Sequence, residues 1–438
     1  MRKVRTIAPM LSAIAALSVA TATTTVCAPP AFAASDSFYT YHGDVPLSDI
    51  EPGTVLDTRT LSYHIAGIAT PVTAIQLLYR TTDAQYRPSA GVTSVLIPPG
   101  GADPARAVAY QSFYDSLDPE HGPSRSIAGD LSFGGMVVAS EATLISGILA
   151  GGYTVIIADT EGPQADFAAG PEYGMTTLDS IRAATHSADT SLTPETRIGL
   201  MGYSGGAIAT GWAAALAPTY APEVDARIVG ATEGGLLVNP AHNLRYVSGS
   251  LGWSGVAAMA IIGVARSYGI DFTPYLSPYG AQIVAAVEHA SIGNVLFQHP
   301  GLTWAQMVKP EYADPNSVVP LVDSVDKVNL ATAPTPTIPL YIAQGAGGEA
   351  EGTSGGNPSV GPGDGVMVAG DVRALARRYC ESGNALVEYH QYDGLSHIPT
   401  LAVWSTGALA WIDARFAGQP AGSSCGAIAP GNPLSSDL

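Results

Sequence analysis

The sequence predicts an α/β fold with a mostly parallel sheet, helices on both faces and one helical insertion. Extended apolar segments alternate with helix-compatible segments at a spacing of roughly 30 to 45 residues, which is typical of parallel sheets. The alternation stops at residues 238–330 and resumes after a proline-rich linker at 334–339. The chain has 438 residues, 46% of them hydrophobic and 13% charged, so it can bury a large core.

Strands are expected where apolar and β-branched residues run between turn residues. These runs lie at residues 73–79, 93–97, 107–110, 153–158, 198–201, 227–231, 340–343 and 386–392. Helices are expected where apolar residues recur at helical spacing. Such segments lie at residues 144–150, 177–186, 207–217, 372–378 and 400–416. The first part of the mature chain, residues 34–60, is expected to be an irregular arm.

The insertion contains helical segments separated by prolines and no pair of strand candidates. The clearest helices are expected at residues 256–265 and 281–290. Residues 256–265 are apolar on every face, so this helix is either fully buried or presented to something apolar.

Residues 1–33 are typical of an export signal. Basic residues precede an apolar segment at residues 7–20, and Ala-Phe-Ala at 31–33 supplies a small-x-small cleavage site. Pro9 and several hydroxyl residues interrupt the apolar segment, which falls short of the ~20 apolar residues of a membrane span. We therefore expect a secreted protein without a stable membrane anchor.

The net charge indicates which partners the protein can bind, and the cysteines indicate the cellular compartment in which it works. The formal net charge is −18 at pH 7, so phosphate backbones would be repelled and nucleic acid is not an expected partner. Removal of the signal leaves Cys380 and Cys425. In an exported protein such a pair most simply forms one disulfide, which would close a loop of roughly 45 residues and contribute about 3–4 kcal/mol.

A candidate nucleophile lies where a predicted strand passes directly into a predicted helix. Residues 202–206 are Gly-Tyr-Ser-Gly-Gly, a G-x-S-x-G motif with Ser204 at its apex. The flanking glycines allow strand and helix backbones to pass closely, and the sharp turn exposes the serine hydroxyl beside the N–H of Gly205. This context predicts a nucleophilic serine whose following N–H contributes to an oxyanion hole.

A serine of this kind needs an imidazole base that a carboxylate orients. His242, His289 and His299 lie in the insertion, and His390 lies within a predicted strand. His397 lies in a loop between the last strand and the last helix, where a base is expected in this fold class, and His390 is its main competitor.

The acid should follow the strand at residues 340–343. Glu349, Glu351 and Asp364 lie in a long glycine-rich loop there, and position alone does not separate them. Asp371 is expected to cap or open the helix at 372–378. Asp393 is expected to form a turn.

Several motifs resemble the secretory lipases of the yeast lipase-A type, which also occur as exported proteins of actinobacteria. They are residues 52–56 (Pro-Gly-Thr-Val-Leu), 114–116 (Tyr-Asp-Ser), 159–163 (Asp-x-Glu-Gly-Pro), 178–184 (Leu-Asp-x-x-Arg-Ala-Ala), 202–206, 209–212 (Ala-Thr-Gly-Trp) and His397. The resemblance covers essentially the whole mature chain. It implies an α/β-hydrolase core at residues 34–237 and 331–438, a helical cap at 238–330, and hydrolysis of lipid esters.

The resemblance also assigns two further site residues. It places the triad acid at Asp364, seven residues before Asp371, and the second oxyanion donor at Asp115. Two departures from the family keep Glu349 and Glu351 open as alternatives. Gly365 and Val368 replace the Glu and Pro of the family's Asp-Glu-x-x-Pro pattern, and the loop before Asp364, residues 345–363, is longer than usual. Glu161 and Asp179 are expected to be structural.

The sequence thus predicts a secreted carboxylic-ester hydrolase, a lipase, that needs no metal or cofactor. Ser204, His397 and Asp364 would form the triad, and Asp115 and Gly205 the oxyanion hole. Its partner would be a lipid or another ester, at a lipid–water interface or in solution. Alternatives are an esterase for short acyl or polysaccharide-bound esters, a serine peptidase of the same fold, and an exported binding protein without catalysis.

Overall fold

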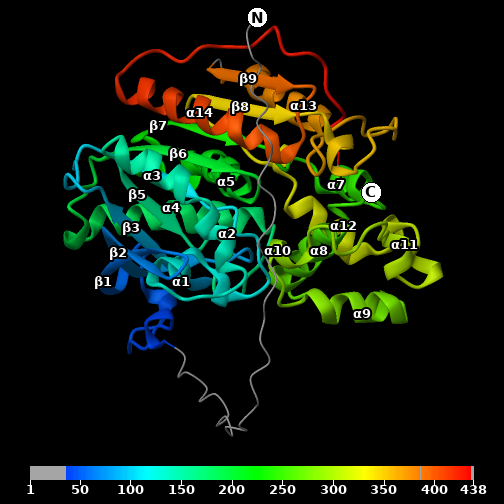
Figure 1. The fold of residues 1–438 in the computed structure, drawn as a ribbon, viewed down its shortest axis with the longest axis horizontal. Helices are drawn as coiled ribbons and strands as arrows, with labels where there is room; N and C mark the ends of the chain where they lie inside the picture. Colours follow the sequence, from blue (N-terminus) through cyan, green and yellow to red (C-terminus); the bar gives the residue numbers. More distant parts are fainter. Residues whose placement is uncertain (1–35, 385, 436–438) are drawn as a thin grey trace, which may run out of the picture. The chain divides into compact units, whose positions relative to one another are not determined.

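A computed structural model of the chain describes residues 36–384 and 386–435. The predicted export signal at residues 1–33 lies outside the described residues. The described chain is built on a nine-stranded sheet in the order β1-β2-β3-β5-β4-β6-β7-β8-β9 (Figure 1). The strands from β5 to β9 in this order are parallel, whereas β1, β2 and β3 pair antiparallel. The predicted α/β class with a mostly parallel sheet is confirmed.

The strands agree closely with the apolar segments of the sequence, with one exception. Their bounds are β1 Val55–Ile65, β2 Ile68–Thr82, β3 Pro88–Ile97, β4 Arg106–Gln111, β5 Thr154–Ala158, β6 Arg197–Tyr203, β7 Ile228–Gly234, β8 Leu340–Gly345 and β9 Val387–Tyr392. The expectation of an irregular arm over residues 34–60 was wrong at its end, because β1 begins at Val55. This edge strand is largely half-exposed and polar, so it has no apolar run that would reveal it.

Helices cover both faces of the sheet. One face carries α1 Pro123–Ala128, α3 Ala142–Ala150 and α14 His397–Phe416, and the other carries α4 Gly170–His186, α5 Gly205–Tyr220 and α13 Ala369–Glu381. In Figure 1 the orange-red α14 lies along β7 and β8. Alternate residues of β6 serve the two layers: Leu200 packs in the cluster with α4 and α5, and Met201 packs in the cluster with α14.

The interruption between β7 and β8 is helical, as the sequence predicts. It contains α7 Pro240–Val247, α8 Ser254–Tyr268, α9 Pro278–Val287, α10 Ile292–Val295, α11 Trp304–Met307 and α12 Val319–Lys327, shown in green to yellow in Figure 1. These helices have a hydrophobic cluster of their own, which includes Leu244, Ala258, Ile283 and Leu321. The apolar α8 also contributes Val256 and Met259 to the main core.

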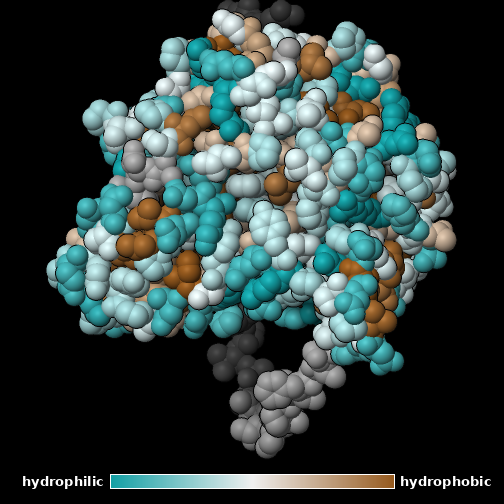
Figure 2. All heavy atoms as spheres, turned by 180° about the vertical axis from the view of Figure 1, so that it is seen from behind, coloured by the Kyte–Doolittle hydropathy of each residue, from teal (hydrophilic) through white to brown (hydrophobic). Residues whose placement is uncertain are grey.

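The C-terminal region is closed by the predicted disulfide. Cys380 at the end of α13 is bonded to Cys425, 45 residues further along the chain. No helix among the described residues is long and apolar enough to cross a membrane. On the face opposite to that of Figure 1, apolar residues form separate groups within a largely polar surface (Figure 2).

Candidate active site

Ser204 lies at a strained turn between β6 and α5. Its backbone has φ 56° and ψ −121°, a conformation that L residues rarely adopt. A Cβ on Gly202 would lie 2.1 Å from the carbonyl oxygen of Gly206, and one on Gly206 would lie 2.0 Å from that of Gln111. Glycine is therefore needed at both positions, for the reason that the sequence motif suggests.

The structure brings Ser204, His397 and Asp364 into one hydrogen-bonded row. The Oγ of Ser204 lies 2.8 Å from Nε2 of His397, and Nδ1 of the same ring lies 2.8 Å from Oδ2 of Asp364. All three side chains are buried. This geometry fits a ring that donates from Nδ1 to the carboxylate and accepts the serine proton at Nε2.

These residues follow the carboxyl ends of parallel strands, at one edge of the sheet. Ser204 follows β6, Asp364 lies in the loop after β8, and His397 follows β9. In contrast to the expected loop position, His397 is the first residue of α14. The backbone N–H of His397 donates to the carbonyl oxygen of Asp364 at 2.7 Å, which fixes the helix start beside the acid.

The Asp364 carboxylate is held on both oxygens. Its Oδ1 accepts the N–H groups of Val366 and Met367 at 3.1 and 2.8 Å, and its Oδ2 also accepts the side-chain amide of Gln344 at 3.0 Å. Backbone and amide donors of this kind stabilise the ionised form of a carboxyl group.

The other candidate acids and bases have different partners. Asp371 lies in the first turn of α13, whose N-cap is Val368, so it opens the helix rather than caps it. Its buried carboxyl group lies 2.8 Å from Nδ1 of His242. Asp393 is exposed and His390 lies in β9. Glu349 is exposed, whereas Glu351 is buried and accepts the backbone N–H of Ile398.

Two aromatic side chains that the motifs did not single out pack on the His397 ring. Tyr203 lies with its ring centroid 5.0 Å away, and its hydroxyl donates to the carbonyl oxygen of His397 at 2.6 Å. Trp253, at the start of α8, approaches edge-on at 5.1 Å. Tyr203 lies inside the G-x-S-x-G motif, but the contact of Trp253 comes from the insertion and has no sequence signal of its own.

Asp115 and Gly205 meet beside the serine. A Cβ on Gly205 would lie 1.7 Å from Oδ1 of Asp115, so the carboxyl group rests directly against this glycine. Gly205 is the first residue of α5, where backbone N–H groups have no intrahelical acceptor. Asp115 has φ 37° and follows β4 by a short loop. Gly205 therefore offers a free backbone donor next to Ser204, and the Asp115 carboxyl group lies against the same glycine.

Burial keeps the Asp115 carboxyl protonated well above its usual pH range. Desolvation, followed by the negative field of Glu141, raises the pKa of Asp115 well above 3.8. Burial also raises the pKa of Glu141 to about 7, although this carboxyl accepts hydrogen bonds from Tyr110, Ser112 and Phe113. A protonated Asp115 can donate a hydrogen bond that a carboxylate cannot.

Glu161 and Asp179, which were expected to be structural, hydrogen-bond to neighbouring backbone and side-chain groups. Glu161 accepts the N–H of Ser116, next to Asp115, and the hydroxyl of Tyr173 at 3.0 Å. Asp179 accepts hydrogen bonds from Thr81, Arg182 and Tyr220. Neither carboxyl group bonds to Ser204 or His397.

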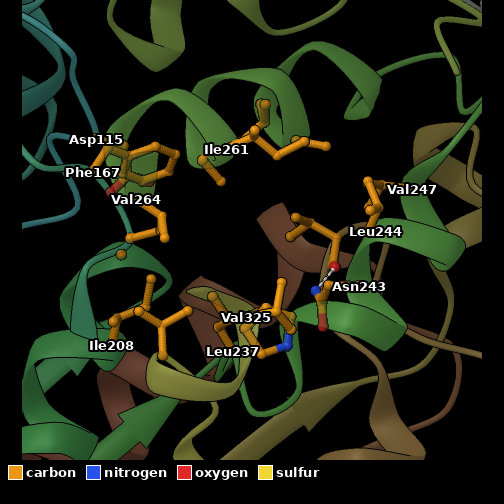
Figure 3. A pocket seen from close by; sticks show the side chains of 18 of the residues that line it. Asp115, Phe167, Ile208, Leu237, Asn243, Leu244, Val247, Ile261, Val264 and Val325 are labelled. Carbon is orange, nitrogen blue, oxygen red and sulfur yellow. Dashed lines mark hydrogen bonds between the residues drawn. The ribbon is translucent and has the colours of Figure 1, made fainter. Parts of the chain in front are cut away.

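An apolar cavity of about 110 Å³ opens from the site under the helical insertion. It reaches Asp115 and Gly205 at one end, and in Figure 3 Phe167, Ile261 and Val264 lie across it from Ile208, Leu237 and Val325. Its lining is mostly aliphatic and comes from α5, α7, α8 and α12. Such a cavity suits a hydrocarbon chain whose reacting end lies at the serine.

Comparisons with known proteins show which family and which fold this chain shares. A family model described as secretory lipase matches residues 128–351 and 359–424. A protein of Mycobacterium tuberculosis named "Probable inactive lipase MT1628" is 31% identical over 84% of this chain and 79% of its own. Lipase 2 of Candida albicans is 29% identical over 88% and 82%. The solved structure of Candida antarctica lipase A in its closed state covers 92% of this chain and 91% of its own, with 26% identity and a TM-score of 0.77.

The sheet order, the serine turn and these likenesses define an α/β-hydrolase. A solved rice cell wall degrading esterase of Xanthomonas oryzae, 15% identical with a TM-score of 0.63, shares this fold over 84% of the chain and 99% of its own. Within the class, the chain belongs to the secretory lipase family.

Proposed function

We propose that this chain is a secreted lipase that cleaves carboxylic esters through an acyl-enzyme on Ser204. The observation that carries the proposal is the hydrogen-bonded row from Ser204 through His397 to Asp364, with 2.8 Å at each step. A hydroxyl in this arrangement loses its proton to the ring as it attacks. Export is proposed from residues 1–33 and from the family.

A residue can be assigned to each step of the proposed reaction. The Oγ of Ser204 bonds to the ester carbonyl carbon while its proton moves to Nε2 of His397. Asp364 stabilises the resulting imidazolium through Nδ1. The imidazolium then protonates the leaving alkoxide as the ester C–O bond breaks, and a water attacks the acyl-enzyme by the same route in reverse. The developing oxyanion would be met by the N–H of Gly205 and by Asp115.

The substrate is proposed to be a neutral ester with an apolar acyl chain. The cavity beside Ser204 has a mostly aliphatic lining, which stabilises a hydrocarbon chain and offers few partners to a sugar or peptide. The net charge of −18 disfavours anionic substrates. Residues 238–330 would act as the cap that shelters this chain from water.

Hydrolysis rates across acyl lengths test this function. On p-nitrophenyl esters from acetyl to oleoyl, we expect kcat/KM to increase beyond the shortest acyl groups, and Ser204→Ala to abolish turnover while the protein stays folded. Highest rates on acetyl esters or acetylated polysaccharide would favour the short-chain esterase instead. Rapid cleavage of a peptide amide would favour a peptidase.

A non-catalytic role is the second candidate, because a relative of similar length is named a probable inactive lipase. The hydrogen bonds of Ser204 argue against inactivity in this chain. A folded wild-type protein that hydrolyses no ester would support the second candidate.

A further inference from the structure

The long glycine-rich loop after β8 carries a second buried carboxyl group, that of Glu351, which hydrogen-bonds to the residue after His397. Glu351 ends a short 3-10 helix, Gly348–Glu351, and is 8% exposed. Its two oxygens have different partners: Oε1 accepts the N–H of Ile398 at 2.8 Å, and Oε2 accepts the indole N–H of Trp253 at 2.9 Å. One side chain thus connects the helical insertion to the residue that follows His397.

Both hydrogen-bond partners of Glu351, Ile398 and Trp253, lie next to His397. Ile398 lies in the first turn of α14, which starts at His397 without a side-chain cap from Ser396. Glu351 therefore takes the place of the missing cap at a helix start, where a carboxylate is favourable. Trp253 packs edge-on against the His397 ring at 5.1 Å and also lines the apolar cavity.

A glycine next to Asp364 leaves space for the hydrogen bond between Glu351 and Trp253. A Cβ on Gly365, directly after Asp364, would lie 3.0 Å from both Oε2 of Glu351 and the indole nitrogen of Trp253. Gly365 also has φ 128°, which favours glycine. Glycine at this position thus leaves the space that the Glu351–Trp253 pair needs.

We propose that Glu351 is a positioning residue, which holds the His397 ring through Trp253 and Ile398 and couples it to the wall of the acyl cavity. This inference rests on the proposed function. Glu351 touches neither the nucleophile nor the reacting ester, so its loss should change how often the ring is aligned with Ser204. It should leave the binding of a short ester unchanged.

A series of variants at Glu351, with Glu349 as the matched control, tests the proposal. Glu349 lies in the same loop, is exposed, and carries the same charge. On p-nitrophenyl acetate we expect kcat per titrated active site to fall by about 10- to 100-fold in Glu351→Ala. Glu351→Gln, which keeps one acceptor oxygen, should lose less. KM should change little, and Glu349→Gln and Glu349→Ala should match the wild type.

A double-mutant cycle isolates the bond to the insertion. Trp253→Phe keeps a ring against His397 but removes the indole N–H, so it should lower kcat alone and add little in the Glu351→Ala background. If Glu351→Ala does not fold, the same cycle with Glu351→Gln in its place decides the matter. Additive losses, or Glu351 variants that behave as the Glu349 controls do, would overturn the proposal.

Ser204→Ala measured in the same series separates the two proposals. Ester hydrolysis by Ser204→Ala would contradict the proposed function itself. An inactive Ser204→Ala together with unimpaired Glu351→Gln and Glu351→Ala would leave the function standing and remove only the positioning role. A loss in Glu351→Gln as deep as that of Ser204→Ala would also overturn positioning, because it would make Glu351 a member of the catalytic set.

Discussion

At the scale of single residues, the proposed catalysis depends on the transfer of one proton from Ser204 to His397. The ring can accept that proton only in the tautomer that donates from Nδ1, and Asp364 is the acceptor that selects it. Three donors from Gln344, Val366 and Met367 hold Asp364 in place. The carboxylate is thus fixed independently of the ring that it orients.

Replacing the acid tests this role. We expect Asp364→Asn to lower kcat by about 10,000-fold, because the amide favours the wrong tautomer of His397. Asp393→Asn, in the exposed turn four residues before His397, should leave kcat unchanged. Steady-state kinetics on one p-nitrophenyl ester compares the two, and equal effects of both substitutions would refute the assignment.

The raised pKa of Asp115 leads to a pH prediction. Its raised pKa means that the carboxyl keeps its proton at acidic pH and loses this donor as pH rises through the raised pKa. Asp115→Ala should lower kcat by about 100- to 1000-fold. Asp115→Asn donates at every pH, so it should retain more activity and lose the alkaline decline of kcat. An identical alkaline limb in Asp115→Asn would argue against a protonated donor.

Some residues of the candidate site could be predicted from the sequence, and others could not. Ser204 has a motif with a physical cause, and His397 has a position that follows from strand order. Asp364 came only from family resemblance, since three acids share a loop whose path depends on tertiary contacts. The contacts of Trp253 and Glu351 join segments 98 residues apart and left no local pattern.

At the scale of elements, the chain positions its site by ending parallel strands at one edge. Strands with β-branched runs were predictable because burial on both faces demands such residues. The polar edge strand β1 was missed because pairing with β2, rather than composition, makes it a strand. The start of α14 at His397 was missed because a carboxylate from a distant loop occupies its N-terminus.

The disulfide joins the end of α13 to the C-terminal segment. Replacing Cys380 and Cys425 with alanine should lower the free energy of unfolding by about 3–4 kcal/mol, because the unfolded chain loses a closed loop. Denaturant unfolding, with and without reductant, measures this difference. Kinetic constants of the folded variant should stay at wild-type values, since neither cysteine lines the cavity.

At the scale of the whole molecule, several buried carboxyl groups favour folding in acid. Glu233 near the carboxyl end of β7 is buried, and neither of its carboxyl oxygens has a hydrogen-bond partner among the described residues. Burial raises its pKa from 4.5 to about 8, and the pKa of Asp166 rises to about 7 and that of Asp159 to about 6. Because each folded pKa lies above the unfolded value, this stability is complete at low pH and is lost as pH rises.

Glu233 provides the test of this pH dependence. At pH 7 its protonation in the folded state costs about 3 kcal/mol, from a pKa difference between 4.5 and about 8. Glu233→Gln should therefore raise the melting temperature at pH 8 and leave it nearly unchanged at pH 4. Glu195→Gln, on the surface, should match the wild type at both pH values. A wild-type melting temperature that rises steadily from pH 4 to pH 8 would contradict this account.

The most direct test of the central claim is covalent labelling of the folded protein with a fluorophosphonate, followed by intact mass and peptide mapping. We predict one adduct per chain, located on Ser204 and nearly absent in His397→Ala. A folded wild-type chain that stays unlabelled, or one labelled equally well in His397→Ala, would contradict an imidazole-activated serine.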